Sequence, residues 1–159
     1  MNIYKNLNDL PNLVNKLKSE GKKIVFTNGC FDVLHAGHVD YLMKAKSFGD
    51  VLVVGLNSDV SVRSIKGEKR PIVPENERAF ILSNLKSVDY VALFDEDTPE
   101  ELIKSITPDV LVKGADWSKE KIVGGSFVES YGGRVERIEF VNNQSTTNII
   151  QVIIDRYKN

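Results

Sequence analysis

Short runs of apolar residues alternate along this chain with stretches in which apolar residues recur every third or fourth position. Runs such as 51–56 and 90–94 are typical of strands that are covered on both faces. The three-to-four spacing predicts helices between them. The predicted strands cover 23–27, 51–56, 90–94, 109–112 and 134–140, and the predicted helices cover 7–17, 37–48, 75–85, 99–107 and 145–157.

Local residues predict where several of these helices begin and end. Gly21 and Gly49 are suited to end the first two. The stretch 98–101, Thr-Pro-Glu-Glu, predicts a capping box with proline at the first helical position. In the helix 75–85, we expect four apolar side chains to face the core: Phe80, Ile81, Leu82 and Leu85.

Strands that alternate with helices predict an α/β fold with a parallel sheet covered on both faces. Right-handed crossovers then give a doubly wound, Rossmann-like sheet. At 159 residues the chain is suited to a single domain, with 1–22 as an N-terminal helix extension and 23–159 as the main domain. In such folds ligands bind at the carboxyl ends of the strands, where we expect the polar segments 27–38, 113–117 and 145–147.

Charge and cysteine content exclude several classes of function. The formal net charge of −1 predicts no general attraction to nucleic acid or to an anionic membrane. Cys30 is the only cysteine, which excludes an internal disulfide and a thiolate metal cluster. No apolar run approaches membrane-spanning length and the N-terminus has no apolar leader, so we expect a cytoplasmic protein.

The two histidines of the chain, His35 and His38, lie beside the predicted start of the helix 37–48. A helix N-terminus attracts phosphate, and two imidazoles there can donate hydrogen bonds to phosphate oxygens. Gly37 leaves room for a ligand, and Gly29, after Thr27 and Asn28, would let backbone amides approach it. The alternatives are a pair of surface histidines, a capping histidine beside a loop, or a zinc site, for which a third ligand at fixed spacing is missing.

Two common nucleotide-binding motifs are absent. The chain has no Gly-x-x-x-x-Gly-Lys-Ser/Thr loop, so it is not a Walker-type NTPase. It also lacks Gly-x-Gly-x-x-Gly after its first predicted strand, which weakens a nicotinamide dehydrogenase interpretation. Because His35 and His38 lack a third ligand at fixed spacing, we also predict no metal site formed by the protein alone.

A basic stretch, 63–71, is a candidate for binding a triphosphate. It includes Lys66 and Arg70, and Arg78 follows on the next predicted helix. These cations could neutralise a triphosphate and its departing pyrophosphate. The alternative is a solvated charged loop and an exposed arginine.

Two further segments carry candidate binding groups. In 113–117, Gly114 permits close approach of a ligand. Asp116 can accept a hydrogen bond from a sugar or a base, and Trp117 can stack on a ring of the ligand. In 145–147 three hydroxyls open the last helix, where one acts as the cap and together they form a second anion site. For 113–117 the alternative is a turn whose tryptophan covers the edge of the core, and for 145–147 it is a helix cap alone. Cys30, a weaker candidate, is expected to be a small buried thiol.

Together these motifs resemble the His-x-Gly-His nucleotidyltransferase superfamily, and within it the adenylyltransferases of ADP-heptose synthesis, in their stand-alone form. The resemblance rests on Thr27–His38, on Lys66-Gly67 with Arg70-Pro71, on Lys113–Trp117 and on Ser145–Thr147. It implies transfer of AMP from ATP, with Mg²⁺, to D-glycero-β-D-manno-heptose 1-phosphate, with release of pyrophosphate and no covalent intermediate. It also implies a possible homodimer, and neither nucleic acid nor membrane as a partner.

The resemblance implies a role for each matching position. The expected catalytic residues are His35, His38 and Lys66. The expected nucleotide-binding residues are Thr27, Asn28, Gly29, Phe31, Gly37, Arg70, Arg78, Gly114, Asp116, Ser145, Thr146 and Thr147. The expected acceptor-binding residues are Asp32, Asn57, Asp59 and Trp117.

Two other functions stay open at this point. One is CTP-dependent transfer to glycerol 3-phosphate or another small polyol phosphate. The related cytidylyltransferase family carries an arginine shortly before its Ser-Thr-Thr segment, and 141–144 has none, which argues against it. The other is a nucleotide-binding module that has lost turnover.

Overall fold

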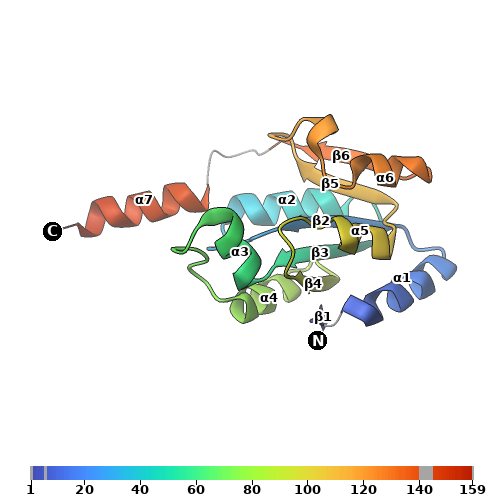
Figure 1. Cartoon of the computed structure of the whole chain (residues 1–159), viewed down its shortest axis with the longest axis horizontal. Helices are drawn as coiled ribbons and strands as arrows, with labels where there is room; N and C mark the ends of the chain where they lie inside the picture. The colour runs from blue at the N-terminus through green and yellow to red at the C-terminus, as the bar shows by residue number, and fades with distance from the viewer. Residues whose placement is uncertain (1, 6, 140–144, 159) are drawn as a thin grey trace.

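The computed structural model, which describes residues 2–5, 7–139 and 145–158, contains a six-stranded parallel sheet (Figure 1). The strand order is β1-β4-β3-β2-β5-β6. The strands are β1 (Ile3–Tyr4), β2 (Ile24–Gly29), β3 (Val51–Asn57), β4 (Tyr90–Phe94), β5 (Val110–Gly114) and β6 (Arg134–Ile138). The α-helices are α1 (Leu10–Ser19), α2 (Ala36–Lys46), α3 (Asp59–Lys66), α4 (Glu75–Ser83), α5 (Glu100–Ile106), α6 (Gly125–Ser130) and α7 (Thr146–Tyr157), and short 3-10 helices cover Leu7–Asp9 and Lys119–Lys121.

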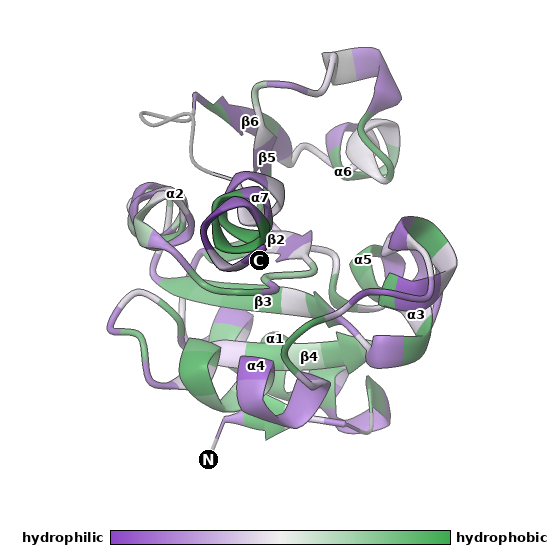
Figure 2. Cartoon of the chain, turned by 90° about the vertical axis from the view of Figure 1, so that its left-hand side faces the viewer, coloured by the Kyte–Doolittle hydropathy of each residue, from purple (hydrophilic) through white to green (hydrophobic). Residues whose placement is uncertain are grey.

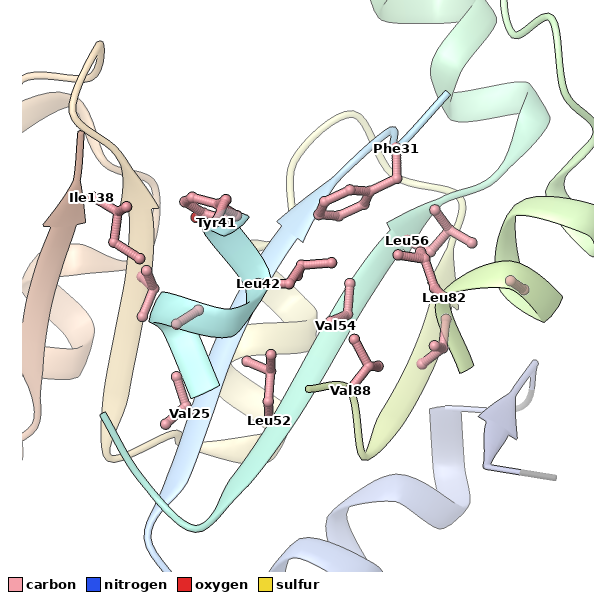
Figure 3. Packing of buried hydrophobic residues seen from close by; sticks show 14 of the residues in the cluster. Val25, Phe31, Tyr41, Leu42, Leu52, Val54, Leu56, Leu82, Val88 and Ile138 are labelled. Atoms are coloured by element: carbon pink, nitrogen blue, oxygen red, sulfur yellow. The ribbon is translucent and has the colours of Figure 1, made fainter. Parts of the chain in front are cut away.

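Side chains that alternate along the central strands fill two separate cores, one on each face of the sheet. Val25 of β2 faces the core formed with α2 and α4, which Figure 3 shows from close by. Its neighbours Ile24 and Phe26 face the opposite core, formed with α1, α5 and α6. Each large apolar side chain that is fully buried contributes about 1.5–3 kcal/mol relative to exposure. The predicted doubly wound α/β fold is confirmed.

The sheet reverses its order of growth between β2 and β5. The chain adds β3 and β4 on one side of β2, then returns to add β5 and β6 on the other side. The loops that follow β2 and β5 therefore leave the sheet at a topological switch point, where open α/β sheets bind their ligands.

Several local expectations need correction. Phe80 and Ile81 are 54% and 41% exposed, because α4 instead turns Arg78, Ala79 and Leu82 toward the interior. Pro99 occupies the N-cap position of α5 without a side-chain cap bond, so the 98–101 capping box is wrong.

Other elements were not anticipated. The basic stretch 63–71 begins inside α3, whose N-cap Ser58 accepts from the amide of Ser61. The strand β1 and the helix α6 are also additions, and the predicted end of the last strand at residue 140 lies outside the described residues.

The N-terminal segment contributes more than a helix. Its strand β1 pairs with β4. Leu10 and Val14 of α1 are fully buried in the core that also contains Phe26. The described part of the segment 1–22 therefore packs into the same core and sheet as the rest of the chain, across the boundary proposed at residue 22.

The last helix, α7, runs away from the body of the molecule (Figure 1). None of its residues is buried, and Figure 2 shows its mixture of apolar and polar residues end-on. In the part of the chain that the structure describes, no helix is both long and apolar enough to cross a membrane.

Candidate active site

The loop between β2 and α2 holds a strained backbone. Phe31 and Val33 have φ values of 46° and 51°, in the left-handed region that favours glycine. Such conformations cost on the order of 1–3 kcal/mol each and persist where the surroundings fix them. The strain therefore marks this loop as one whose shape is imposed by its contacts.

Asp32 is the residue that fixes the loop. Its carboxylate is almost fully buried and accepts from Arg70 Nε at 2.6 Å and from the amides of Ile72 and Val73, each at 2.9 Å. Burial alone would raise the pKa of Asp32, but the two amides and the Arg70 guanidinium outweigh it and hold the pKa below its usual value. Asp32 thus joins the loop after β2 to the segment 70–73 and stays ionised.

The two histidine rings stack on each other at the start of α2. His35 is the N-cap residue and His38 lies in the first turn, with ring centroids 3.8 Å apart and planes inclined by 26°. The ring of Phe31 meets His38 edge-on at 5.4 Å. The predicted closeness of the two imidazoles is thus seen in the geometry, although His35 lies at the N-cap position, without a side-chain cap bond, rather than on the face of the helix.

Both imidazoles are neutral and lack a partner at one nitrogen. Nδ1 of His35 and Nδ1 of His38 are buried without a hydrogen bond. Burial lowers the pKa of His35, and burial together with the neighbouring His35 lowers the pKa of His38 to about 4. Buried polar atoms are normally hydrogen-bonded, so these two are suited to receive a ligand.

Two adjoining cavities open at this switch point, and they share a wall. The histidine lobe has a volume of about 570 Å³, and the 97–99 lobe has a volume of about 510 Å³, both within the range of small-molecule sites. The histidine lobe alone is lined by His35, Tyr41, Gly114, Asp116 and Ser145. The 97–99 lobe alone is lined by Asp32, Asn57, Ile65, Arg70, Asp97, Thr98, Pro99, Ile122, Val123 and Thr147, and the shared wall is formed by Asn28, Gly29, Cys30, Phe31, His38, Lys66, Lys113, Trp117 and Thr146.

Lys113, at the carboxyl end of β5, brings a half-buried positive charge to the shared wall. Its Nζ donates to Asn28 Oδ1 and lies 6.0 Å from the centroid of the Trp117 ring. Burial lowers the pKa of Lys113 to about 8, although the charge of Asp116 opposes the shift. No role was predicted for Lys113 from the sequence, although its place directly after a buried strand was a signal that could have identified it.

The start of α7 closes the cavity from the other side. Ser145 Oγ accepts from the amide of Asn148 at 3.1 Å, so Ser145 is the cap. The hydroxyl of Thr146 donates to the Asp32 carbonyl oxygen, which attaches α7 to the loop after β2. All three hydroxyl residues of the motif line one lobe or both, with Thr147 in the 97–99 lobe.

Four of the expected site residues lie away from the cavity. Thr27 is fully buried, with its hydroxyl 2.7 Å from Tyr41 Oη and 3.0 Å from the Val112 carbonyl oxygen. Gly37 is buried in the first turn of α2. Arg78 is 1% exposed rather than on the surface, and it forms an ion pair with Asp59 at 2.7 Å.

Arg78 and Asp59 are therefore placed to hold the framework behind the site. The Arg78 guanidinium also donates to the carbonyl oxygens of Cys30, Asn57 and Val73. These bonds tie the loop after β2 and the end of β3 to α4. The remaining expected residues line the cavity.

The thiol of Cys30 lines both lobes but is not activated. Burial raises the pKa of Cys30 above its ordinary value, despite the nearby cations Lys66, Arg78 and Arg70. A protonated thiol is a poor nucleophile at neutral pH. Within the described residues, no group of three His, Cys, Asp or Glu side chains is arranged to hold a metal ion.

The sequence of this chain is similar to those of several known proteins. Residues 26–152 match the family described as cytidylyltransferase-like. "Bifunctional protein HldE" of Geobacter metallireducens is 61% identical over 153 residues, which are 96% of this chain and 31% of that protein. The protein of the same name from Wolinella succinogenes is 57% identical over 136 residues, which are 86% of this chain and 28% of that protein. The chain thus spans about a third of the length of these relatives.

Solved structures give the same picture of the fold. The lipopolysaccharide core biosynthesis protein of Thermoplasma volcanium superposes with a TM-score of 0.63 at 31% identity, covering 78% of this chain and all of that one. Pantoate-beta-alanine ligase of Francisella tularensis, solved with an ATP analogue and beta-alanine, gives a TM-score of 0.64 at 16% identity, covering all of this chain and 78% of that one. The second likeness concerns the fold alone.

Proposed function

The chain belongs to the cytidylyltransferase-like family of nucleotidyltransferases, and from this premise we propose that it transfers AMP from ATP to D-glycero-β-D-manno-heptose 1-phosphate. The products are ADP-heptose and pyrophosphate. The observation that carries the proposal is the stacked histidine pair, whose Nδ1 atoms have no partner, at the start of α2 inside a two-lobed cavity. The choice of acceptor rests on the motifs of the sequence and on the similarity to the HldE proteins.

In this reaction a phosphate oxygen of the acceptor attacks the α-phosphorus of ATP. A phosphorus–oxygen bond forms as the bond to the β-phosphate oxygen breaks, and pyrophosphate leaves with that electron pair. A phosphate monoester is ionised at neutral pH, since its second pKa is about 6, so the enzyme needs no strong base. Mg²⁺ enters with ATP as the substrate complex and neutralises charge on the triphosphate.

The residues of the site supply position and positive potential. The start of α2 and the imidazoles of His35 and His38 would hold the phosphates, because a helix N-terminus and N–H donors both favour anions. Lys66, on the shared wall, adds a positive charge for the leaving pyrophosphate. Gly114 and Asp116, in the histidine lobe, would flank the nucleoside.

The acceptor would then occupy the 97–99 lobe. Asp97 and Thr98 offer a carboxylate and a hydroxyl for sugar hydroxyl groups, and the half-exposed Trp117 offers a ring face. Two substrates that fill neighbouring lobes meet at the shared wall. This arrangement supports a direct displacement. Each substrate has its own lobe, and the reacting atoms of both meet at the shared wall.

A pyrophosphate-release assay tests the proposal. ATP and CTP are each combined with heptose 1-phosphate and with glycerol 3-phosphate, and ATP with the heptose should give the fastest turnover. His35→Ala and His38→Ala should each lose on the order of a hundredfold in turnover, as for a lost transition-state donor. Lys22→Met, at an exposed position outside the cavity, is the matched control. Full activity in both histidine variants would reject the mechanism.

The family description gives one alternative a specific basis. It is transfer of CMP from CTP to glycerol 3-phosphate or a similar polyol phosphate. The same assay separates the two functions, because faster turnover with CTP and glycerol 3-phosphate would replace our first choice. The segment 141–144, on which the sequence argument against this alternative depends, lies outside the described residues.

We also propose that two copies of the chain associate through α7. Four of its apolar side chains are 41–81% exposed: Val152, Ile153, Ile154 and Tyr157. A single helix of this length is marginally stable in water unless its apolar side is packed. Light scattering should give a dimer, and Ile153→Glu with Ile154→Glu should give a monomer; a wild-type monomer at all concentrations would reject the dimer.

A further inference from the structure

We propose that Lys113 is a catalytic residue that binds the phosphate of the acceptor where the two lobes meet. The inference rests on the proposed function, which requires an anionic acceptor to reach the α-phosphorus of the nucleotide. Lys113 is one of the residues that line both lobes. An anion that passes from the 97–99 lobe toward the histidine lobe therefore meets this side chain.

In the described part of the chain, the charge of Lys113 has no carboxylate in direct contact, although Asp116 acts on it from a greater distance. Its hydrogen-bond acceptor, Asn28 Oδ1, is neutral. Among the described residues, no carboxylate forms an ion pair with Lys113. Partial burial makes a charged amine costly unless it is paired, and the lowered pKa of Lys113 is a consequence of that cost. A phosphate dianion beside Nζ would remove the cost.

The other cations of the 97–99 lobe are less suited to this task. Arg70 is already paired with Asp32 at 2.6 Å. Lys66 is exposed at the end of α3, where its charge is screened by water. His38 is neutral, because its pKa lies at about 4. Among the described residues of this lobe, Lys113 is thus the half-buried cation that has no ion-pair partner and can meet an incoming anion.

During the reaction Lys113 neither gains nor loses a covalent bond. It neutralises one charge of the attacking phosphate, which reduces the repulsion between this phosphate and the α-phosphate. It also orients the attacking oxygen. Both effects act on the acceptor, so removal of the charge should affect the kinetic parameters of the acceptor and leave nucleotide affinity nearly unchanged.

The pH dependence offers a separate test. Lys113 is protonated below about pH 8, so kcat/KM for the acceptor should fall as the pH rises through about 8. The charges of Asp116 and Cys30 act on Lys113, and His38 and Lys66 are titratable groups that line the same shared wall. His38 titrates at about 4, and burial raises the pKa of Cys30, so neither accounts for a decrease near pH 8.

Three variants test the role of Lys113. Lys113→Met removes the charge but keeps an apolar side chain of similar length, Lys113→Arg keeps the charge at all accessible pH values, and Lys22→Met is the control. The measurements are steady-state kinetics with the acceptor, calorimetric affinity for a non-hydrolysable ATP analogue, and the midpoint of thermal unfolding.

We expect Lys113→Met to lose on the order of a hundredfold in kcat/KM for the acceptor, as for a lost transition-state contact. Its affinity for the ATP analogue should be unchanged and its unfolding midpoint should be equal or higher, because an apolar side chain avoids the cost of the half-buried charge. In Lys113→Arg the decrease near pH 8 should disappear. Normal acceptor kinetics in Lys113→Met, an equal loss of ATP affinity, or a lowered unfolding midpoint that explains the loss would each overturn the inference.

The outcome for Lys113 can be separated from that of the proposed function. If the wild-type protein uses another phosphorylated acceptor, the heptose assignment fails and the comparison of variants proceeds with that acceptor. If no acceptor reacts, calorimetry with inorganic phosphate in the presence of the ATP analogue gives the answer. Weaker phosphate binding by Lys113→Met than by wild type then supports the inference, and equal binding overturns it.

Discussion

Replacement of Arg78 by methionine should destabilise the chain severely. Arg78 is 1% exposed and donates four hydrogen bonds, to the carbonyl oxygens of Val73, Cys30 and Asn57 and to Asp59 Oδ1. Their lengths lie between 2.7 and 2.9 Å. The substitution leaves all four acceptors without this donor while filling a similar volume.

The expected magnitude follows from the burial of these groups. Loss of one partner of a buried ion pair costs about 3–5 kcal/mol, and each unsatisfied carbonyl adds about 1–3 kcal/mol where water cannot reach it. Water can reach Asp59, which is 25% exposed, and the cavity beside Cys30, so these costs are not incurred in full and we place the total below their sum, at about 3–5 kcal/mol. Typical domains have only about 5–15 kcal/mol of stability, so the variant should be marginally folded.

The assay is equilibrium unfolding in urea at neutral pH, which gives the free energy of unfolding of each variant. Arg78→Lys keeps the charge but loses the planar arrangement of donors, so it should show an intermediate loss. Lys22→Met, at an exposed position away from the site, should change the free energy little. A loss below about 1 kcal/mol in Arg78→Met would refute the argument that these bonds hold the framework of the site.

Three other residues give predictions of stability. Asp32→Asn should lower the free energy of unfolding at neutral pH in urea titrations. The pKa of Asp32 is lowered in the folded protein, so the difference in free energy between wild type and variant should vanish as the pH falls below about 3.9 and through the folded value. Gly49→Ala should cost about 1–3 kcal/mol in the same assay, because its Cβ would lie 2.8 Å from the Lys23 carbonyl oxygen; an unchanged free energy would contradict this. The native pKa of His38, about 4, lies below its ordinary value of 6.5, so wild type should lose stability as the pH falls through this interval, and His38→Gln should show a flatter dependence of Tm on pH.

The central strands could be predicted because each is a continuous apolar run. Strands covered by helices on both faces have no polar side, and the run 51–56 falls in the fully buried strand β3. The doubly wound fold then follows from alternation and handedness. The helix α3 was missed because its charged residues outweighed the cap at Ser58 and the apolar Val62 in our interpretation.

Side-chain direction was harder to predict because it depends on distant partners. Phe80 and Ile81 are exposed since α4 turns Arg78 inward, and the acceptors of Arg78 come from segments up to 48 residues away. For the same reason, sequence alone gave no sign that Thr27 bonds to Tyr41 behind the site. Most of the cavity residues were predicted, because they lie at the ends of strands or the starts of helices.

The most direct test of our central claim is a titration of the two histidines by NMR. The chain has only His35 and His38, so the spectrum of protein with labelled histidine contains two sets of signals, and His35→Ala assigns them. Without ligand, the pKa of His38 should lie at about 4. With a bound non-hydrolysable ATP analogue and Mg²⁺, we predict a clear rise, because phosphate oxygens favour the charged imidazole. Unchanged titration curves at full occupancy would contradict the claim that this pair binds the phosphates of the nucleotide.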